Sequence, residues 1–572
     1  MKKKISDIII EFLISKGVTD IFGYPGGSIN HLIDSASKYS EITAHDNYNE
    51  QGSSFAACGY AQASHKLGVA FSTSGPGATN LITGIAGAYF DSVPTLFITG
   101  NVDTPAEKGD MPIRQRGFQE TDMVAVTKSI SKWAYHVKSA SEIRYVLEKA
   151  YYVAFEGNPG PVVLDIPNDI QRLEYEGELK GFEVNQLFVT DKISHSDIET
   201  VLACIKDAKQ PVFLFGNAAK TYGAERLVKD VVEALNMPAI FSMPANDTLP
   251  YNHSHNYGFI GTNGYRYANM LTLKADLIIA VGTRMDIRQI GLNRQQFAPN
   301  AKLIRVEIDK TQVDYKVKQE ELVLHYNLVP FLEELLRLAT NQGVKVSNEW
   351  NDKCTFIKKK LQGIDDEFFN KVIQRISHIT HDSQVDNRAY ATADVGQNLL
   401  WTYRSFNVLD NQQIFASTGN APMGYSLPAA IGVTLATHRP VIAFCGDGGF
   451  MMNIQEMQFV KREQLPIKVV VLNNRSLGMI RSWQNRYLGK CSLTTADSGY
   501  LSPNVELLAK AFDFKYSIIK SIEDVERVDW NDSKPEVVEV YLDDDTETKP
   551  LNNMKDQTPQ IDRDLYNELM NL

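Results

Sequence analysis

The chain has 572 residues, of which 43% are hydrophobic and 22% are charged, and these fractions exclude a wholly disordered or fibrous protein. At about 150 residues per domain, the length predicts three or four domains. Lys and Arg number 58 and Asp and Glu 69, which gives a formal net charge of −11. Because nucleic-acid-binding proteins are usually basic, we expect no nucleic-acid partner.

The N-terminal segment predicts an amphipathic helix rather than a targeting signal. Three lysines at positions 2–4 precede Ile8-Ile9-Ile10, but Asp7 and Glu11 interrupt the apolar run and no cleavage site follows. No uncharged apolar stretch reaches the roughly 18 residues of a membrane span, so we expect no membrane association. The five cysteines are far apart and form no C-x-x-C pair. We therefore expect neither disulfides nor a zinc site, and a cytoplasmic location.

Short apolar, β-branched runs recur along the chain and predict strands. They do not alternate polar and apolar residues, which is typical of strands buried on both faces of a parallel sheet. Helix-like stretches separate the runs, so the fold class is α/β. The runs lie at residues 69–73, 95–99, 162–164, 212–215, 277–281, 441–444 and 468–472.

Two polar segments, at about 170–195 and 340–368, are interpreted as linkers. They divide the chain into predicted domains at 1–170, 190–340 and 368–545, each expected to be a doubly wound parallel sheet. A tail at 546–572 follows, expected to be a solvated surface segment that ends in a helix-like piece.

The most informative motif is Gly446-Asp447-Gly448, which follows the predicted strand 441–445. Open α/β sheets bind ligands at the carboxyl ends of their strands, and glycines let a phosphate approach the backbone. We expect the next helix, at 454–464, to point its N-terminus toward the same place. Asn473-Asn474 follows the next strand. Asp and Asn oxygens, a backbone carbonyl and diphosphate oxygens form a set that suits Mg²⁺. An ordinary strand-turn-helix is the alternative for Gly-Asp-Gly alone.

Gly-Asp-Gly followed one strand later by Asn-Asn resembles the thiamine-diphosphate signature. The chain as a whole resembles the large subunit of the acetohydroxyacid (acetolactate) synthase family over about residues 5–515, with its motifs in the family's order. The matching motifs are FGYPGG at 22–27, NEQG at 49–52, TSGPGATN at 73–80, GFQE at 117–120, PGP at 159–161, RMDIR at 284–288, VGQ at 395–397 and MGYSLPAA at 423–430.

The resemblance implies pyrimidine-binding, central and diphosphate-binding domains, with thiamine diphosphate and Mg²⁺ as cofactors. It assigns Glu50 to the cofactor's aminopyrimidine, where a buried acid exchanges the proton that activates the thiazolium carbon. It gives Asp447, Asn474 and the Ser476 carbonyl as Mg²⁺ ligands. The implied cofactor contacts are Tyr24, Pro25, Thr73, Pro76 and Asn80 on the pyrimidine side, and Val395, Gly396, Gln397, Asn398, Ala421, Met423, Asp447, Gly448, Gly449, Asn474, Ser476, Gly478 and Met479 on the other.

The reaction implied is decarboxylation of pyruvate to hydroxyethyl-thiamine diphosphate, followed by transfer of the two-carbon unit to a second 2-keto acid. Arg288 would grip the acceptor carboxylate, Trp483 would narrow the acceptor pocket, and Gln119 would lie near the reacting centre. Two alternatives stay open. One is transfer of the acetaldehyde unit to a keto-sugar nucleotide in branched-sugar or surface-polysaccharide biosynthesis. The other is simple 2-keto acid decarboxylation, which the absence of a His-His pair disfavours.

The resemblance also implies FAD with a structural role, held in the central domain by Arg284, Asp286 and Glu307. Some positions depart from the family pattern. Asn49 and Asn398 replace histidines, Ala421 stands where glycine is expected, and Asn158 replaces the arginine expected before Pro159-Gly160-Pro161. Because Glu50 and Asp447 belong to different subunits in the family, we expect at least a homodimer, or a homotetramer, with a small regulatory subunit as a further expected partner.

Overall fold

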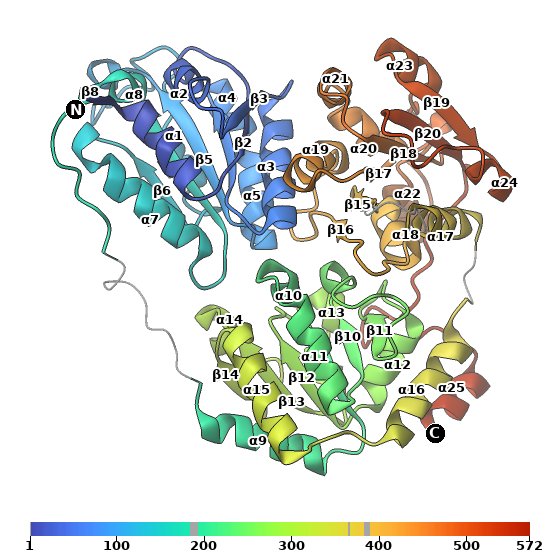
Figure 1. Cartoon of the computed structure of the whole chain (residues 1–572). Helices are drawn as coiled ribbons and strands as arrows, with labels where there is room; N and C mark the ends of the chain where they lie inside the picture. Colours follow the sequence, from blue (N-terminus) through green and yellow to red (C-terminus); the bar gives the residue numbers. More distant parts are fainter. Residues whose placement is uncertain (1, 184–192, 364–366, 382–388) are drawn as a thin grey trace. The chain divides into compact units, whose positions relative to one another are not determined.

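The computed structural model describes residues 2–183, 193–363, 367–381 and 389–572 (Figure 1). The chain forms two compact units, which are described one at a time. The first unit comprises residues 1–188, 382–399 and 414–546, and the second comprises 189–381, 400–413 and 547–572.

The N-terminal sheet of the first unit has six parallel strands in the order β3-β2-β4-β5-β7-β6. One face packs on α1, whose apolar side chains at 5, 9 and 13 are buried, which confirms the amphipathic first helix. The elements are β1 (Lys3–Lys4), α1 (Ile5–Ser15), β2 (Asp20–Gly23), α2 (Asn30–Ala36), β3 (Thr43–Asp46), α3 (Glu50–Ser64), β4 (Gly68–Ser72), α4 (Pro76–Asn80), α5 (Ile82–Asp91), β5 (Thr95–Asn101), η1 (Thr104–Ala106), α6 (Met123–Thr127), β6 (Trp133–His136), η2 (Ala140–Glu142), α7 (Ile143–Phe155), β7 (Pro161–Pro167), α8 (Asn168–Arg172) and β8 (Glu174–Tyr175).

The C-terminal sheet of this unit is also parallel, with the order β16-β15-β17-β18-β20-β19. The helix expected at 454–464 is α21, but it is not the next helix after the motif, because the short helix α20 begins at Asp447 itself. The elements are β15 (Tyr390–Ala393), α18 (Gln397–Ser405), β16 (Ile414–Phe415), α19 (Ser426–Thr437), β17 (Val441–Gly446), α20 (Asp447–Met452), α21 (Glu456–Arg462), β18 (Ile467–Asn473), α22 (Gly478–Leu488), η6 (Ala496–Ser498), α23 (Val505–Ala511), β19 (Lys515–Ile519), α24 (Ile522–Val525) and β20 (Glu536–Tyr541). Helix α18 begins in this unit and continues into the second unit from residue 400.

The two sheets of the first unit share one hydrophobic core, in which α3 packs against α19. Two glycines allow the helices to approach closely. A Cβ on Gly59 of α3 would lie 2.3 Å from the Ala429 carbonyl oxygen, and a Cβ on Gly432 of α19 would lie 1.9 Å from the Ala56 carbonyl oxygen. The contact is reciprocal, since each glycine accommodates the backbone of the other helix.

The second unit holds a third parallel sheet, in the order β11-β10-β9-β12-β13-β14. Numbered within the sheet, this is the 3-2-1-4-5-6 order of dinucleotide-binding folds. Its elements are α9 (His195–Asp207), β9 (Pro211–Phe215), α10 (Ala218–Thr221), α11 (Glu225–Leu235), β10 (Ala239–Phe241), η4 (Met243–Ala245), β11 (Asn256–Phe259), α12 (Arg266–Lys274), β12 (Leu277–Val281), α13 (Ile287–Ile290), η5 (Arg294–Gln296), β13 (Lys302–Glu307), α14 (Lys310–Asp314), β14 (Leu322–His325), α15 (Leu328–Gln342), α16 (Asn348–Leu361), α17 (Phe368–His381) and α25 (Arg563–Met570).

The polar segment expected to be a linker at 340–368 is largely helical. Helix α16 buries Trp350, Cys354, Ile357 and Leu361, spaced as one helix face, while its lysines cover the other face. The expected solvated tail also packs on the second unit, where Leu551 and Leu569 are buried; its expected final helix is α25. Of the other expected linker, residues 184–192 lie outside the described residues.

The three parallel sheets confirm the predicted α/β class, and each predicted apolar run forms a strand. The predicted domain boundaries stay a prediction. Among the described residues, no helix is long and apolar enough to cross a membrane.

Candidate active site

Three strands of the C-terminal sheet end beside one another in polar residues. Asp447 directly follows β17 and is buried, and its carboxylate accepts a hydrogen bond of 3.0 Å from the Tyr500 hydroxyl. Burial raises the pKa of Asp447 to about 6. A buried carboxylate gains from a bound cation, which would lower that pKa again.

Asn474 and Ser476 follow the neighbouring strand β18 and are buried. The Asn474 amide nitrogen donates to Gln397 Oε1 at 3.1 Å and to the Thr546 carbonyl at 3.4 Å. The amide oxygen is therefore the atom with which Asn474 would bind a cation. The Ser476 hydroxyl accepts from Arg481 at 3.1 Å, which holds this turn in place.

Glycines shape the space around these oxygens. Gly396 has φ +98°, a conformation that favours glycine, and no heavy atom lies within 4 Å of the position that a Cβ would take. At Gly448, a Cβ would lie 2.7 Å from Leu477 and 3.2 Å from the Met423 methyl carbon. Open space at Gly396 beside oxygen ligands fits a diphosphate with its Mg²⁺, so the residues present fit the cofactor that the sequence predicts.

Asp394 is a residue of this site that the sequence did not single out. It follows β15, is fully buried, and accepts hydrogen bonds from the N–H groups of Val395 at 2.8 Å and Gly424 at 2.9 Å. Burial raises its pKa to about 6. A Cβ on Gly449 would lie 2.1 Å from its Oδ2. Asp394 thus ties the turn that carries Met423 to the end of the first strand, and an Asp just before Val395-Gly396 was the available signal.

Two residues predicted to contact the cofactor, Asn398 and Gly478, also have contacts within the protein. The Asn398 amide nitrogen donates to the carbonyls of Asp394 at 3.0 Å and Phe444 at 3.1 Å. A Cβ on Gly478 would lie 2.1 Å from Gln397 Oε1, so this glycine allows Gln397 to reach Asn474. Ala421, expected to be glycine, has φ +51°, where alanine is strained.

Glu50 lies in the N-terminal half of the same unit, as the first residue of α3. It is buried, and its Oε2 accepts a hydrogen bond of 2.9 Å from the Asn80 amide. A Cβ on Gly77 would lie 2.9 Å from Glu50 Oε1. Asn49, which replaces the family's histidine, caps α3 by accepting from the Gln51 N–H at 2.8 Å. Glu50 and Asn80, both predicted to lie on the pyrimidine side of the cofactor, are therefore in contact.

Glu456 fixes the turn before Glu50, and no sequence motif pointed to this residue. This buried glutamate of α21 accepts from the Asn47 amide at 2.9 Å and from the Tyr48 N–H at 3.1 Å. A Cβ on Gly52 would lie 2.5 Å from its Oε1. Burial raises the pKa of Glu456 to about 7.

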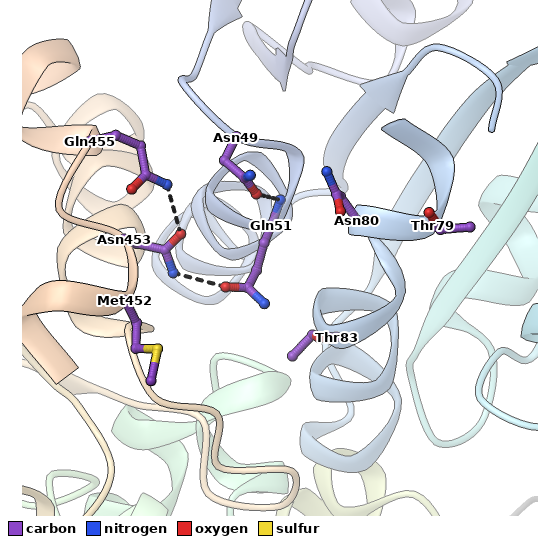
Figure 2. Close-up of a pocket in the computed structure, with 8 residues that line it drawn as sticks. All are labelled: Asn49, Gln51, Thr79, Asn80, Thr83, Met452, Asn453 and Gln455. Atoms are coloured by element: carbon purple, nitrogen blue, oxygen red, sulfur yellow. Dashed lines mark hydrogen bonds between the residues drawn. The ribbon is translucent and has the colours of Figure 1, made fainter. Parts of the chain in front are cut away.

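A polar pocket of about 250 Å³ lies beside the start of α3 in the first unit (Figure 2). Amide side chains dominate its wall, and Asn453 donates to Gln51 Oε1 at 3.1 Å and accepts from Gln455 at 3.3 Å. Only Asn80 of the predicted site residues lines it. The lining residues are Asn49, Gln51, Thr79, Asn80, Thr83, Met452, Asn453 and Gln455.

The predicted residues thus form two groups in the first unit, one around Glu50 and one around Asp447. In the part of the chain that the structure describes, no hydrogen bond joins Glu50 to Asp447 or Asn474. The turn that carries Thr73 and Pro76 lies with the first group, since a Cβ on Gly77 would lie 2.8 Å from the Thr73 side chain. Tyr24 and Pro25, which follow β2, are exposed.

The two predicted reaction residues of this unit are partly exposed. Gln119 has φ +64°, and its Cβ would lie 2.8 Å from a Cβ on Gly75. Trp483 of α22 is 53% exposed, and Met479 on the same helix is also exposed. Exposed apolar groups at the edge of a candidate site are available to a substrate or to a second chain.

The predicted flavin residues follow β12 and β13 in the second unit. Arg284 is exposed, and Asp286 caps α13 by accepting from the Arg288 N–H at 2.8 Å. Glu307 is buried and accepts from the N–H groups of Ile308 at 2.9 Å and Asp309 at 3.1 Å. Burial raises the pKa of Glu307. An acidic group at a strand end of such a sheet fits a ribose hydroxyl, so these residues fit a dinucleotide. Arg288 is exposed in this unit.

Comparison with known proteins shows the same three parts. Residues 3–126 match the thiamine pyrophosphate enzyme N-terminal TPP binding domain, residues 198–335 the central domain, and residues 394–539 the C-terminal TPP binding domain. Thiamine pyrophosphate (TPP) is thiamine diphosphate under another name.

Full-length relatives cover most of the chain. It is 35% identical to the acetolactate synthase large subunit of Lactococcus lactis over 89% of this chain and 87% of the relative. It is 34% identical to the acetolactate synthase isozyme 1 large subunit of Escherichia coli over 84% of each chain. Identity to acetolactate synthase 1, chloroplastic, of Oryza sativa is 33%, over 85% of this chain and 75% of the relative. The chain therefore belongs to the acetolactate synthase large-subunit family of thiamine pyrophosphate enzymes.

Proposed function

We propose that this protein is a thiamine-diphosphate-dependent carboligase of the acetolactate synthase type. It decarboxylates pyruvate and transfers the two-carbon unit to a second 2-keto acid. The observation that carries the proposal is the pair of buried acids at equivalent sheet edges. Asp447 lies among oxygen ligands beside open backbone, and Glu50 is held by Asn80 at the start of α3.

Asp447, Asn474 and the Ser476 carbonyl would hold Mg²⁺, and the backbone at Gly396, Gly448, Gly449 and Gly478 would surround the diphosphate. Val395, Gln397 and Asn398 line the same turn, and Met423 would support the rings from the other side. When bound, thiamine diphosphate supplies a carbon nucleophile that adds to the keto group and stores the electrons released with CO₂.

Glu50 would hold and exchange the proton on the cofactor's aminopyrimidine. Asn80 donates to Oε2 at 2.9 Å, which leaves Oε1 for this exchange. The carboxyl is buried, so bulk water does not compete for the proton. Tyr24, Pro25, Thr73 and Pro76 would form the wall around the same ring.

Arg288, Gln119 and Trp483 would govern the acceptor. A guanidinium binds a carboxylate through two parallel hydrogen bonds, which suits Arg288 to a 2-keto acid. Trp483 and Met479 would limit the size of the acceptor and exclude water. FAD, if carried, would be structural, because joining two keto acids involves no net redox change, and Arg284, Asp286 and Glu307 would contact it.

In a homodimer, each of the two sites would take Glu50 from one copy and Asp447 from the other, and a homotetramer would contain two such dimers. Apolar side chains that are exposed in the first unit support an interface: Met451, Met452, Met479, Ile480, Trp483, Tyr487 and Leu488. The relatives are large subunits, so a small regulatory subunit is a further proposed partner. A cytoplasmic location is proposed with this role.

The test is to incubate the protein with thiamine diphosphate, Mg²⁺, FAD and pyruvate alone, and to measure CO₂ and acetolactate together. The proposal requires one CO₂ per acetolactate, because the first pyruvate loses its carboxylate and the second pyruvate keeps it. Two CO₂ per acetolactate would contradict the proposal. CO₂ with acetaldehyde would move the function to a simple decarboxylase. CO₂ with neither product would move the acceptor to another class, with keto-sugar nucleotides tested next.

A further inference from the structure

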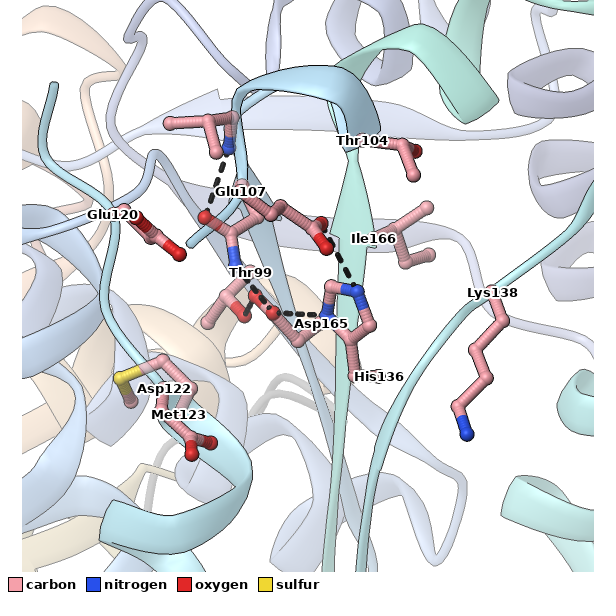
Figure 3. Close-up of polar contacts among 12 residues, drawn as sticks. Thr99, Thr104, Glu107, Glu120, Asp122, Met123, His136, Lys138, Asp165 and Ile166 are labelled. Carbon is pink, nitrogen blue, oxygen red and sulfur yellow. Dashed lines mark hydrogen bonds and ion pairs between the residues drawn. The ribbon is translucent and has the colours of Figure 1, made fainter. Parts of the chain in front are cut away.

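A half-buried cluster of His136, Asp165 and Glu107 lies at the carboxyl ends of β6 and β7 (Figure 3). Asp165 is only 2% exposed and accepts hydrogen bonds from the Thr99 hydroxyl at 2.7 Å and the Asn101 amide at 2.7 Å. His136 lies between the two acids. Its Nδ1 is 2.7 Å from Asp165 Oδ2, and its Nε2 is 3.1 Å from Glu107 Oε1.

Because both ring nitrogens face carboxyl groups, the contact needs a proton on each nitrogen, or one on Nδ1 and one on Glu107. Both arrangements hold two protons, and the loss of one proton breaks the contact between His136 and Glu107. The charged groups that act on His136 and Glu107 are acidic: Asp165 on β7, Glu120 and Asp122 on the segment before α6, and Asp169 on α8. Lys138, two residues beyond His136, is exposed.

Glu107 begins a closed loop at residues 107–120, which carries Gln119. The Glu120 carboxylate accepts from the backbone N–H groups of Lys108 at 2.7 Å, Arg116 at 3.0 Å and Gly117 at 3.1 Å, and so closes the loop on itself. The Arg116 guanidinium also donates to the Glu107 carbonyl at 3.2 Å. The loop is thus a unit of its own, and Glu107 is its link to the sheet through His136.

We propose that His136 is a positioning residue, which holds the 107–120 loop to the sheet through Glu107 and thereby fixes where Gln119 lies against Gly75. The part of this inference that concerns activity rests on the proposed function, whereas the anchoring of the loop does not. A shift of the loop would move Gln119 away from the Thr73–Pro76 turn.

The protonation of the cluster adds a pH dependence. Burial lowers the pKa of His136, but its hydrogen bond to Asp165 and the charges of Asp165 and Glu107 outweigh burial and raise that pKa above its ordinary value. A raised pKa means that the folded protein holds the proton tightly. The anchoring is therefore fully present below the ordinary pKa of 6.5 and is lost as pH rises through the raised pKa.

Limited trypsin digestion tests the anchoring without any activity. Arg114 and Arg116 are exposed in the loop, so trypsin cleaves there once the loop loosens. His136→Gln should speed cleavage after these two residues several-fold at pH 7. Glu107→Ala, which keeps His136 on Asp165, should do the same and covers the case in which His136→Gln fails to fold.

The matched control is His253→Gln, which removes another histidine–carboxylate pair, at 3.0 Å from Glu233, in the second unit. It should leave cleavage in the loop unchanged. The excess cleavage of His136→Gln over wild type should shrink as pH rises through the raised pKa of His136, because the wild-type loop then loosens as well. Unchanged cleavage in both loop variants would overturn the proposal.

The activity arm separates the two proposals. In the holoenzyme, His136→Gln should lower kcat/KM about 10- to 100-fold without weakening the binding of thiamine diphosphate and Mg²⁺, and should remove the fall of the wild-type rate at alkaline pH. Loop loosening with full activity and an unchanged pH profile would overturn the positioning role. Loop loosening in a protein whose wild type forms no acetolactate would overturn the proposed function and leave the anchoring intact.

Discussion

The two sheets of the first unit have the same topology but different residues at their edges. Numbered within each sheet, both have the strand order 2-1-3-4-6-5. The C-terminal edge presents Asp394, Asp447 and Asn474 after its first, third and fourth strands. The N-terminal edge presents Glu50 at the start of the helix after its second strand. With the proposed function, one topology would provide a cation and phosphate site in one half and a proton-exchange site in the other.

The helix that follows the second strand shows the difference most clearly. In the N-terminal half it is α3, which begins with Glu50; in the C-terminal half it is α19, preceded by the turn that carries Met423. These equivalent helices pack on each other through Gly59 and Gly432. The fold supplies matching positions, and the residue type decides whether a position exchanges a proton or supports an apolar surface.

The largest effect is expected from Glu50→Gln, which keeps the contact with Asn80 but removes the exchangeable proton. Carboligation should fall by about 10²–10⁴-fold, while thiamine diphosphate still raises Tm. Steady-state rates measure carboligation, and thermal unfolding measures the rise of Tm with thiamine diphosphate. The exposed Glu41→Gln is the control and should retain full activity; a loss of binding in the Glu50 variant would place Glu50 among the anchoring residues instead.

Removing the cation ligand Asp447 should abolish the binding of thiamine diphosphate with Mg²⁺ rather than slow a chemical step. In the wild type, thiamine diphosphate with Mg²⁺ should raise Tm, because ligands that bind only the folded state stabilise it, and EDTA should reverse the rise. Asp447→Asn should lose this rise while Glu50→Gln keeps it. Asp532→Asn, at a partly exposed position outside the candidate site, serves as the control. A normal Mg²⁺-dependent rise of Tm in the Asp447→Asn variant would contradict the proposed role of Asp447 as a cation ligand.

Glu456 joins the C-terminal half of the first unit to Asn47 and Tyr48 of the N-terminal half, and this contact should make stability depend on pH. Burial raises the pKa of Glu456 to about 7, above its ordinary value of 4.5. Stability from this proton is therefore fully present below pH 4.5 and is lost as pH rises to about 7, up to about 3 kcal/mol. Glu456→Gln should flatten the free energy of unfolding over this range. An unchanged slope, measured by urea unfolding at several pH values, would exclude Glu456 as its source.

Gly432→Ala should loosen the packing of α3 on α19. The new Cβ would lie 1.9 Å from the Ala56 carbonyl oxygen, so the helices must separate. Overpacking of this kind costs about 1–3 kcal/mol, measured by urea unfolding. Gly87→Ala on α5 is the control, since its Cβ would meet only the Ser417 hydroxyl at 3.7 Å. Equal stability of the two variants would contradict the close approach.

The smallest effect is expected at Ala421, which has φ +51° where glycine is favoured. Ala421→Gly relieves strain but gives the unfolded chain more freedom, so we expect a gain of no more than about 1 kcal/mol. Differential scanning calorimetry would measure the change in Tm. A clear loss of stability would show that the turn does not strain alanine.

The sequence predicted the sheets well because buried parallel strands are continuous apolar runs, as at 277–281 and 468–472. It predicted Asp447 and Asn474 because each directly follows such a run. The sequence did not predict α16, because its many lysines made the segment read as polar and obscured the helical spacing of Trp350 and Ile357.

Residues that act through distant partners could not be predicted. Glu456 meets Asn47 across 409 positions of sequence, and Tyr500 meets Asp447 across 53. His136 meets Asp165 across 29. No local pattern marks such pairs, because the fold alone brings them together.

The central claim is that each active site combines the N-terminal edge of one copy with the C-terminal edge of another. Mixing Glu50→Gln protein with Asp447→Asn protein, after dissociation and reassembly, tests it directly. In a mixed dimer, one site combines both defects and the other has intact Glu50 and Asp447. The account predicts recovery of roughly a quarter of wild-type activity, since half of randomly formed dimers are mixed and each has one intact site. No recovery, with mixed dimers demonstrated by native mass spectrometry, would contradict the account.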